Sequence, residues 1–130
     1  MRGLHLTADL HGCPAALAVM ADPAALRLLC LQAVAGAGLQ AVGELFHRFP
    51  APGGVTGVVL LAESHLAVHT WPELGAVTLD VYVCNLGADN SARAKALLAA
   101  LQTAFAPTAA EHQQLLRGQP GEPLSEQSGG

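Results

Sequence analysis

Reactive side chains gather in one short stretch of this chain, LLAESHLAVHTWPELGAVTLDVYVCN, which covers residues 60–85. A hydroxyl or thiol is a nucleophile, an imidazole transfers protons near neutral pH, and a carboxylate can hold hydroxyl groups. Ser64, His69 and Cys84 therefore offer a nucleophile with acid and base partners. No GxSxG sequence surrounds Ser64, so a hydrolase triad is poorly supported.

Metal and pyridoxal chemistry find little support in the same residues. His65 and His69 have the spacing of a zinc-binding helix, but no Glu follows the first histidine. Their surroundings are typical of a strand, which would separate the two rings by about 13 Å. The only lysine, Lys95, lies on a predicted polar helix face, whereas a pyridoxal enzyme needs a Schiff-base lysine. We expect neither a metal nor pyridoxal phosphate.

The composition limits the kinds of protein that this chain can be. Its 130 residues suffice for one domain. Hydrophobic residues make up 52% and charged residues 12%, so apolar surface must be hidden beyond a small core, and we expect self-association. A net charge of −4 with scattered basic residues argues against nucleic-acid binding. Without a membrane-length apolar segment, a signal peptide or paired cysteines, we expect a cytoplasmic protein that binds no membrane.

The elements that must position the reactive residues follow from periodicity and turn signals. Alternation or apolar runs predict strands over residues 3–10, 39–49, 55–62, 65–71 and 76–84. Helices are predicted from Asp22 to Gly36 or Gly38, and after Asn90 until just before Pro107. We expect an α+β, two-layer sandwich, with two main helices on one face of an antiparallel sheet. Residues 1–116 form the domain, and 117–130 a disordered tail.

The turn at residues 72–75 sets the pairing of the last two predicted strands. A four-residue loop makes cross-strand partners sum to 147, so that His65 faces Tyr82 and Cys84 lies beside the Glu63–Ser64 peptide. His69 comes five residues after Ser64, about 16 Å along an extended strand. If both residues act at one site, His69 should come from a partner subunit, with the bare sheet faces packed together.

Taken together, LLAESHLAVHTWPE followed by LDVYVC resembles the prokaryotic, pyruvoyl-dependent S-adenosylmethionine decarboxylase family. The resemblance covers about residues 4–105, with LHLTADLHGC similar to the family's first strand and FHRFPAPGGVTG similar to its substrate loop. It implies self-cleavage between Glu63 and Ser64. The Ser64 hydroxyl attacks the Glu63 carbonyl, and elimination then leaves a pyruvoyl cofactor derived from Ser64.

The resemblance also implies roles for other residues. His69 matches the processing base, Thr56 a hydroxyl that supports processing, and Cys84 the acid that protonates the substrate carbon. Substrate binding is implied for the positions Glu73, Phe49, Trp71 and Asp9. Family members are dimers or higher homo-oligomers with shared active sites. The implied activity is decarboxylation of S-adenosylmethionine for spermidine biosynthesis.

Alternatives remain open at this point. Residues His11 and Asn85 and the length of the loop before Val55 depart from the usual family pattern, which affects substrate choice more than pyruvoyl formation. Relatives of the family decarboxylate arginine or ornithine, so a pyruvoyl-dependent amino-acid decarboxylase is the second interpretation. An unprocessed, non-catalytic interaction module is the alternative from another class.

Overall fold

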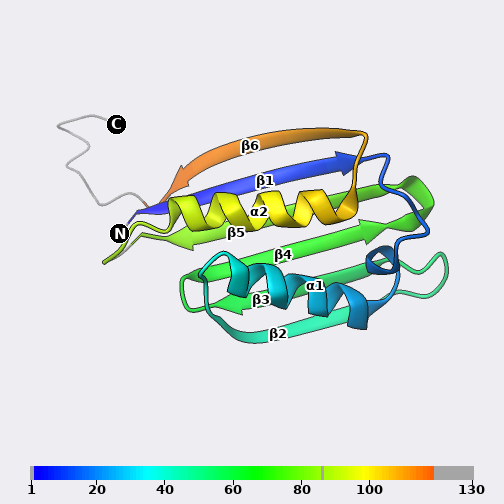
Figure 1. The fold of residues 1–130 in the computed structure, drawn as a ribbon, viewed down its shortest axis with the longest axis horizontal. Coiled ribbons are helices and arrows are strands. Elements are labelled where there is room, and N and C mark those ends of the chain that lie inside the picture. The colour runs from blue at the N-terminus through cyan, green and yellow to red at the C-terminus, as the bar shows by residue number, and fades with distance from the viewer. Residues whose placement is uncertain (1, 86, 119–130) are drawn as a thin grey trace.

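One antiparallel sheet dominates the structure. The computed structural model describes residues 2–85 and 87–118. In this part of the chain, every neighbouring pair of strands is antiparallel, and the order across the sheet is β2-β3-β4-β5-β1-β6. The strands, labelled in Figure 1, are β1 (Gly3–His11), β2 (Ala41–Arg48), β3 (Val55–Leu61), β4 (Ser64–Trp71), β5 (Ala76–Cys84) and β6 (Ala109–Arg117).

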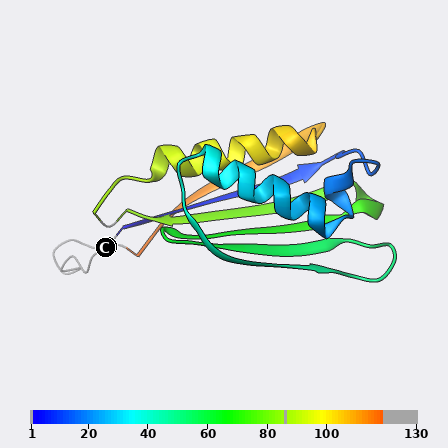
Figure 2. The ribbon, with the colours of Figure 1, turned by 60° about the horizontal axis from the view of Figure 1, so that its bottom comes forward.

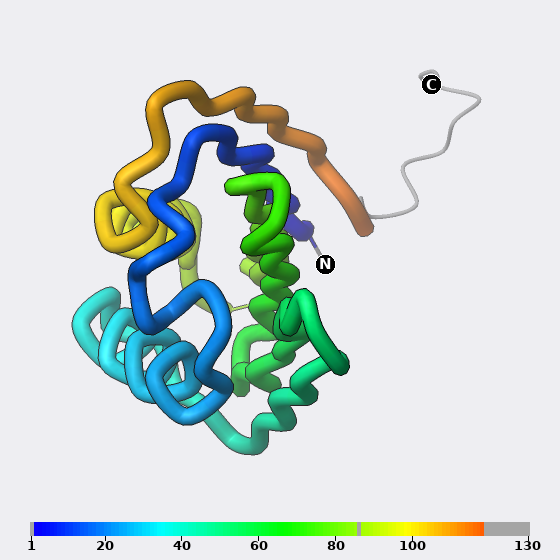
Figure 3. The backbone as a smooth tube through the Cα atoms, turned by 90° about the vertical axis from the view of Figure 1, so that its right-hand side faces the viewer, coloured from blue at the N-terminus to red at the C-terminus, as the bar shows by residue number. Residues whose placement is uncertain are grey.

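Two helices cover one face of this sheet, as expected (Figures 2 and 3). Helix α1 (Pro23–Gly36) packs on β2 and β3, and α2 (Ser91–Phe105) packs on β5 and β1. Helix α1 begins where the sequence predicts, because the Asp22 carboxylate accepts a hydrogen bond from the Ala24 N–H at 3.0 Å and proline follows Asp22. Neither helix is long and apolar enough to cross a bilayer, within the described residues.

The hydrophobic core lies between the helices and the sheet. Alternate residues of β4 and β5 point toward it, and each is at most 1% exposed: Leu66, Val68, Val77, Leu79, Val81 and Val83. Burying a side chain of this size stabilises the fold by about 1.5 to 3 kcal/mol. The two-residue alternation of these strands therefore separates a core-facing side from the opposite side of the sheet.

The predicted β4–β5 register is also confirmed. Trp71 pairs with Ala76 and His65 with Tyr82, so each pair sums to 147. A short 3₁₀ turn, η2 (Pro72–Leu74), joins the strands, and Gly75 follows it with a positive φ of 60°. The Gly75 carbonyl accepts a hydrogen bond from the Cys13 N–H at 2.9 Å, which ties this turn to the end of β1.

The sixth strand is missing from the sequence prediction. Strand β6 pairs with β1 over its whole length, and Arg117, which the sequence places in a disordered tail, is its last residue. As an edge strand, β6 is exposed on both sides along most of its length and lacks a buried alternating face. Its backbone hydrogen bonds to β1, which no apolar pattern reveals, hold it in place. Residues 119–130 of the expected tail lie outside the described residues.

The start of α2 also differs from expectation. Asn90 occupies the N-cap position, but its side chain does not cap the helix. The Ser91 N–H instead donates to the Asp89 carboxylate at 2.9 Å, a bond that lowers the pKa of Asp89 below its ordinary value. The buried Asn90 amide donates to the Cys84 carbonyl at 3.0 Å, so it ties the helix to the end of β5.

No helix of the described residues covers the opposite face of the sheet, which is called the open face below (Figure 3). Two rows of cross-strand neighbours lie on this face. The first, the junction row, consists of Leu60, His65, Tyr82 and His5. The second, the cavity row, consists of Thr56, His69, Thr78 and Asp9.

Candidate functional site

The Glu63–Ser64 peptide lies in the tight turn between β3 and β4. Ser64 is the first residue of β4, is half-buried and has a φ of 156°. Residues other than glycine rarely adopt such a positive φ, which costs roughly 1 to 3 kcal/mol and is concentrated at functional sites. The backbone is therefore strained at the bond that the sequence predicts to break.

Cys84 lies directly beside this peptide, as the strand register predicts. Its backbone N–H donates a hydrogen bond of 2.8 Å to the Glu63 carbonyl oxygen. An N–H on a carbonyl oxygen stabilises negative charge that develops there during nucleophilic attack. The free thiol of Cys84 is half-buried at the end of β5. The Asn90 side chain donates a hydrogen bond to the Cys84 carbonyl. This role of Asn90 was not predicted from the sequence.

His69 and Thr56 meet at the other end of β4. They are cross-strand partners in β4 and β3, and Thr56 Oγ1 lies 3.1 Å from His69 Nδ1. The pair lines a cavity of about 330 Å³, together with Phe49, Trp71, Glu73 and loop residues between 50 and 54. The Trp71 ring stands 6.0 Å from the His69 ring, centroid to centroid. The structure thus gathers five of the predicted site residues around one cavity.

Buried Thr70 fixes the wall of this cavity. Its hydroxyl accepts a hydrogen bond from the Val55 N–H at 2.9 Å and donates one to the Met20 carbonyl at 2.8 Å. The side chain thereby joins β4 to the start of β3 and to the 3₁₀ turn η1 (Ala18–Met20). Sequence reasoning missed Thr70, because a threonine in a strand carries no distinctive signal.

Within one chain, the two groups of predicted residues lie at opposite ends of β4. Ser64 begins the strand and His69 is five residues later, about 16 Å away at the usual strand rise. Asp9 belongs to neither group: it is exposed on β1, two strands from His69 in the cavity row, and does not line the cavity. Within one chain, therefore, Ser64 and His69 are not in contact.

The junction row brings further polar groups near Ser64. Ser64 Oγ lies 3.4 Å from His65 Nδ1, and the His65 ring contacts the Tyr82 ring at a centroid distance of 5.7 Å. On the far side of Tyr82, His5 Nε2 lies 3.1 Å from an Asp80 oxygen. Strand alternation places His65 and Tyr82 on one face, but the β1–β5 register that adds His5 follows only from the structure.

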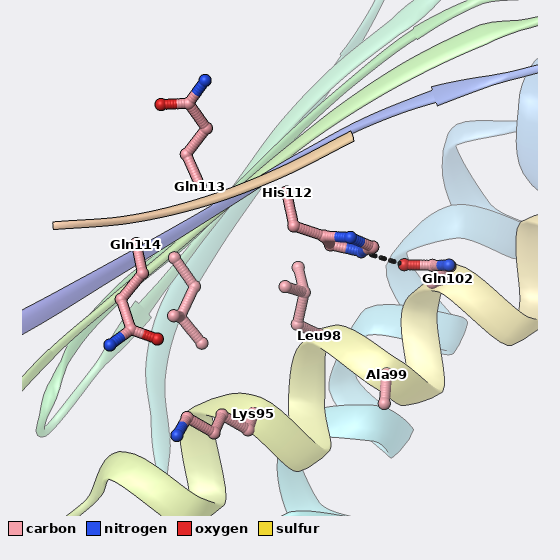
Figure 4. Close-up of a pocket in the computed structure, with 8 residues that line it drawn as sticks. Lys95, Leu98, Ala99, Gln102, His112, Gln113 and Gln114 are labelled. Atoms are coloured by element: carbon pink, nitrogen blue, oxygen red, sulfur yellow. Dashed lines mark hydrogen bonds between the residues drawn. The ribbon is translucent and has the colours of Figure 1, made fainter. Parts of the chain in front are cut away.

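A second hollow lies on the helix side of the sheet, between α2 and β6 (Figure 4). It measures about 310 Å³, and Lys95 of α2 lines it with His112 of β6. His112 Nε2 forms a hydrogen bond of 2.6 Å with the Gln102 side-chain oxygen (Figure 4). None of the predicted site residues lines this hollow, and its lining includes no carboxylate, hydroxyl or thiol. The cavity beside His69 is therefore the better candidate.

Burial separates the three cysteines. It raises the pKa of Cys30 from 9.0 to about 12 and that of Cys13 in the same direction, because a thiolate is poorly solvated in the core. Cys84 alone combines partial exposure with a place beside the strained junction. Among the described residues, no three His, Cys, Asp or Glu side chains cluster as metal ligands would.

Comparison with known proteins gives a consistent result. A sequence profile described as S-adenosylmethionine decarboxylase matches residues 4–118. The S-adenosylmethionine decarboxylase proenzyme of Archaeoglobus fulgidus is 40% identical over 116 residues, which cover 89% of this chain and 97% of that protein. The proenzyme of Acetivibrio thermocellus is 40% identical over 82 residues, or 63% of this chain and 64% of its own length.

The fold agrees with a solved structure. The crystal structure of the adenosylmethionine decarboxylase from Aquifex aeolicus matches with a TM-score of 0.82 and 37% sequence identity, over 92% of this chain and 93% of that one. Several of the sequence alignments are shorter, and this chain spans slightly less than two thirds of the Acetivibrio thermocellus and Syntrophomonas wolfei proenzymes.

Proposed function

The chain belongs to the S-adenosylmethionine decarboxylase family, and we propose that it cleaves itself between Glu63 and Ser64 and then decarboxylates S-adenosylmethionine. The observation that carries this proposal is the junction itself. A strained serine follows a carbonyl group whose oxygen already accepts a hydrogen bond from the Cys84 N–H at 2.8 Å. The half-buried Cys84 thiol and the cavity beside His69 would, without this junction, fit many other functions.

The first step is an attack of Ser64 Oγ on the Glu63 carbonyl carbon. A bond forms between Oγ and that carbon, the carbon–nitrogen bond of the peptide breaks, and the hydroxyl proton moves to the Ser64 nitrogen. The product is an ester. The Cys84 N–H supports this step because it faces the oxygen on which negative charge develops.

The second step removes the Ser64 α-proton. The bond between Cβ and Oγ then breaks, and the Glu63 carboxylate leaves as the end of fragment 1–63. Water converts the remaining dehydroalanine to a pyruvoyl group and releases ammonia. We propose that His69 of a second copy of the chain removes this α-proton. The Thr56 hydroxyl, 3.1 Å from the His69 ring, holds that ring in place.

The surroundings of residue 64 fit a pyruvoyl group. Ser64 is paired on both sides, with Leu61 of β3 and Val83 of β5, so its backbone stays anchored after Glu63 departs. The half-buried Cys84 thiol beside it can return a proton to the substrate carbon. A pyruvoyl group here would supply an electron-accepting carbonyl to a substrate amine.

The proposed partner is a second copy, packed open face against open face. No helix of residues 2–85 and 87–118 covers the open face, yet the side chains of its junction and cavity rows are mostly polar and mostly half-buried. A two-fold axis between the rows would place Ser64 and Cys84 of one protomer against the cavity residues of the other, which are Thr56, His69 and Glu73. Because the interface is symmetric, the dimer would contain two such sites. This arrangement accounts for the separation of about 16 Å along β4.

The cavity beside His69 suits an adenosyl substrate. Its volume of about 330 Å³ is at the lower end of the usual range for ligand pockets. Phe49 and Trp71 offer aromatic surface to a purine, and the Glu73 carboxylate can accept hydrogen bonds from ribose hydroxyls. The smaller arginine and ornithine have neither a purine nor a ribose for these groups.

Intact-mass measurement tests the proposed self-cleavage. The purified protein should give fragments of residues 1–63 and 64–130, the second blocked by a pyruvoyl group, and Ser64→Ala should stay whole. A wild-type chain that keeps its full mass and an ordinary serine under processing conditions would refute the proposal.

Release of carbon dioxide from labelled S-adenosylmethionine, arginine and ornithine tests the substrate. We expect turnover of S-adenosylmethionine alone, and a higher KM for Glu73→Ala by roughly 10- to 100-fold, because the ribose hydroxyls would lose hydrogen bonds to a charged acceptor, which contribute about 1.5 to 3 kcal/mol. Turnover of arginine or ornithine without S-adenosylmethionine would contradict the substrate assignment while leaving self-cleavage intact.

A further inference from the structure

The His65 side chain contacts the cleavage serine, and the steps above leave it without a role. Its Nδ1 lies 3.4 Å from Ser64 Oγ, the only side-chain hydrogen-bond partner of that hydroxyl among the described residues. The distance is long for a hydrogen bond, but such contacts often tighten only as the reaction proceeds. His69, in contrast, is about 16 Å along the strand.

We propose that His65 is the general base of the first cleavage step and acts on Ser64 of its own chain. The assignment rests on the proposed self-cleavage and divides it between two histidines. His65 Nδ1 takes the hydroxyl proton while Oγ bonds to the Glu63 carbonyl carbon. It gives the same proton to the Ser64 nitrogen as the peptide carbon–nitrogen bond breaks, so the step is an isomerisation that consumes nothing.

The junction row holds the His65 ring in place for this task. The Tyr82 ring packs edge-on against it at 5.7 Å, and Tyr82 is held from its other flank by His5 at 5.8 Å. Arg117 lies over the Tyr82 ring at 5.4 Å. A ring fixed in this way keeps Nδ1 directed at Ser64, and a neutral imidazole protonated on Nε2 has an accepting lone pair there.

Removal of each histidine should trap the chain at a different stage of cleavage. Without His69, the chain should form the ester and stop, because the α-proton stays in place. Without His65, it should stop earlier, as an ordinary peptide. Hydroxylamine distinguishes these states, since it attacks an ester at the Glu63 carbonyl and releases a fragment that begins with a free Ser64, whereas it leaves a peptide bond whole.

The experiment measures this fragment in freshly translated full-length chains. The His69→Ala chain should release it on addition of hydroxylamine. The double variant His65→Asn, His69→Ala should release it at least about 100-fold more slowly, the lower end of the range for a positioned acid–base group. Asparagine keeps a polar group near the position of Nδ1 but cannot accept and return a proton. The matched control is His112→Asn with His69→Ala, which alters a histidine on the helix side of the sheet and should release the fragment at the unchanged rate.

Two results would overturn the assignment. One is fragment release by the His65→Asn double variant within about threefold of the His69→Ala rate. The other is accumulation of a hydroxylamine-sensitive ester by His65→Asn alone, which would place its block after the first step. If His65→Asn does not fold, as judged by circular dichroism and thermal unfolding, His65→Gln replaces it with the same two criteria. If the wild-type chain never cleaves, both the proposed function and the role of His65 are wrong. If the wild-type chain cleaves, the results for the His65 variants test the role of His65 alone.

Discussion

The shared site can be tested by combining two inactive chains. One chain carries His69→Ala and the other Ser64→Ala, and each has its own affinity tag. In a mixed dimer with sites formed across the interface, one site joins an intact Ser64 to an intact His69 and the other lacks both. The chain with an intact Ser64 is the His69→Ala chain, so only this chain should be cleaved.

The size of the effect follows from the separation along β4. Each variant alone lacks an essential residue at every site and should yield no fragments. Because about 16 Å separates Ser64 and His69 of one chain, a complete site can form only across the interface of a mixed dimer. Tandem purification on both tags isolates the mixed dimers, in which about half of all chains should be cut, and co-expression without this selection should cut about a quarter. Intact-mass measurement identifies which chain was cut.

The refuting result is equally specific. If mixed dimers are isolated and neither chain is cut, the two residues do not act across the interface, and β4 must bend to bring them together. Cutting of both chains would contradict the assignment as well, because a Ser64→Ala chain has no nucleophile.

Three further perturbations test the packing and the chemistry. Thr70→Val should lower the free energy of unfolding by about 1 to 3 kcal/mol in urea titration, because the Val55 N–H and Met20 carbonyl lose their partner; a loss below about 0.5 kcal/mol would contradict this account. Cys84→Ser should keep the fragments but slow carbon dioxide release at least about tenfold, since a hydroxyl is a much weaker acid than a thiol; unchanged turnover would remove Cys84 as the proton donor. Stability should fall as pH rises above about 9, because the unfolded chain releases the Cys30 proton near pH 9.0 and the folded one only near 12; Cys30→Ala should flatten this slope in urea titrations, and an equal slope would refute it.

The β4–β5 hairpin could be predicted in full because local rules determine it. The loop length at residues 72–75 fixed which residues pair, and alternation fixed which of them face the core. The same two rules predict Cys84 beside Glu63, and the hydrogen bond between their backbones confirms it. Resemblance, rather than geometry, then supplied the roles of Thr56 and Glu73, and the cavity that unites them confirms only that they are neighbours.

Long-range pairings and edge elements could not be predicted. Strand β6 has no buried face, so its sequence AAEHQQLLR shows no strand periodicity. His5 reaches the junction row only because β1 pairs with β5, a contact between segments far apart in the chain. Asn90 shows a third limit: the helix begins after it, as predicted, but its side chain donates to the Cys84 carbonyl instead of capping the helix.

The strand order has a consequence for the cleaved protein. Fragment 1–63 would carry β1, β2 and β3, while fragment 64–130 would carry β4, β5 and β6, and β1 lies between β5 and β6. The two pieces are thus interleaved, and separating them would break the β3–β4, β5–β1 and β1–β6 ladders together. A protein cut in this way can remain as well folded as its precursor. Once unfolded, however, it must reassemble from two molecules, so its recovery would depend on concentration, and the precursor is the only form that folds as a single chain.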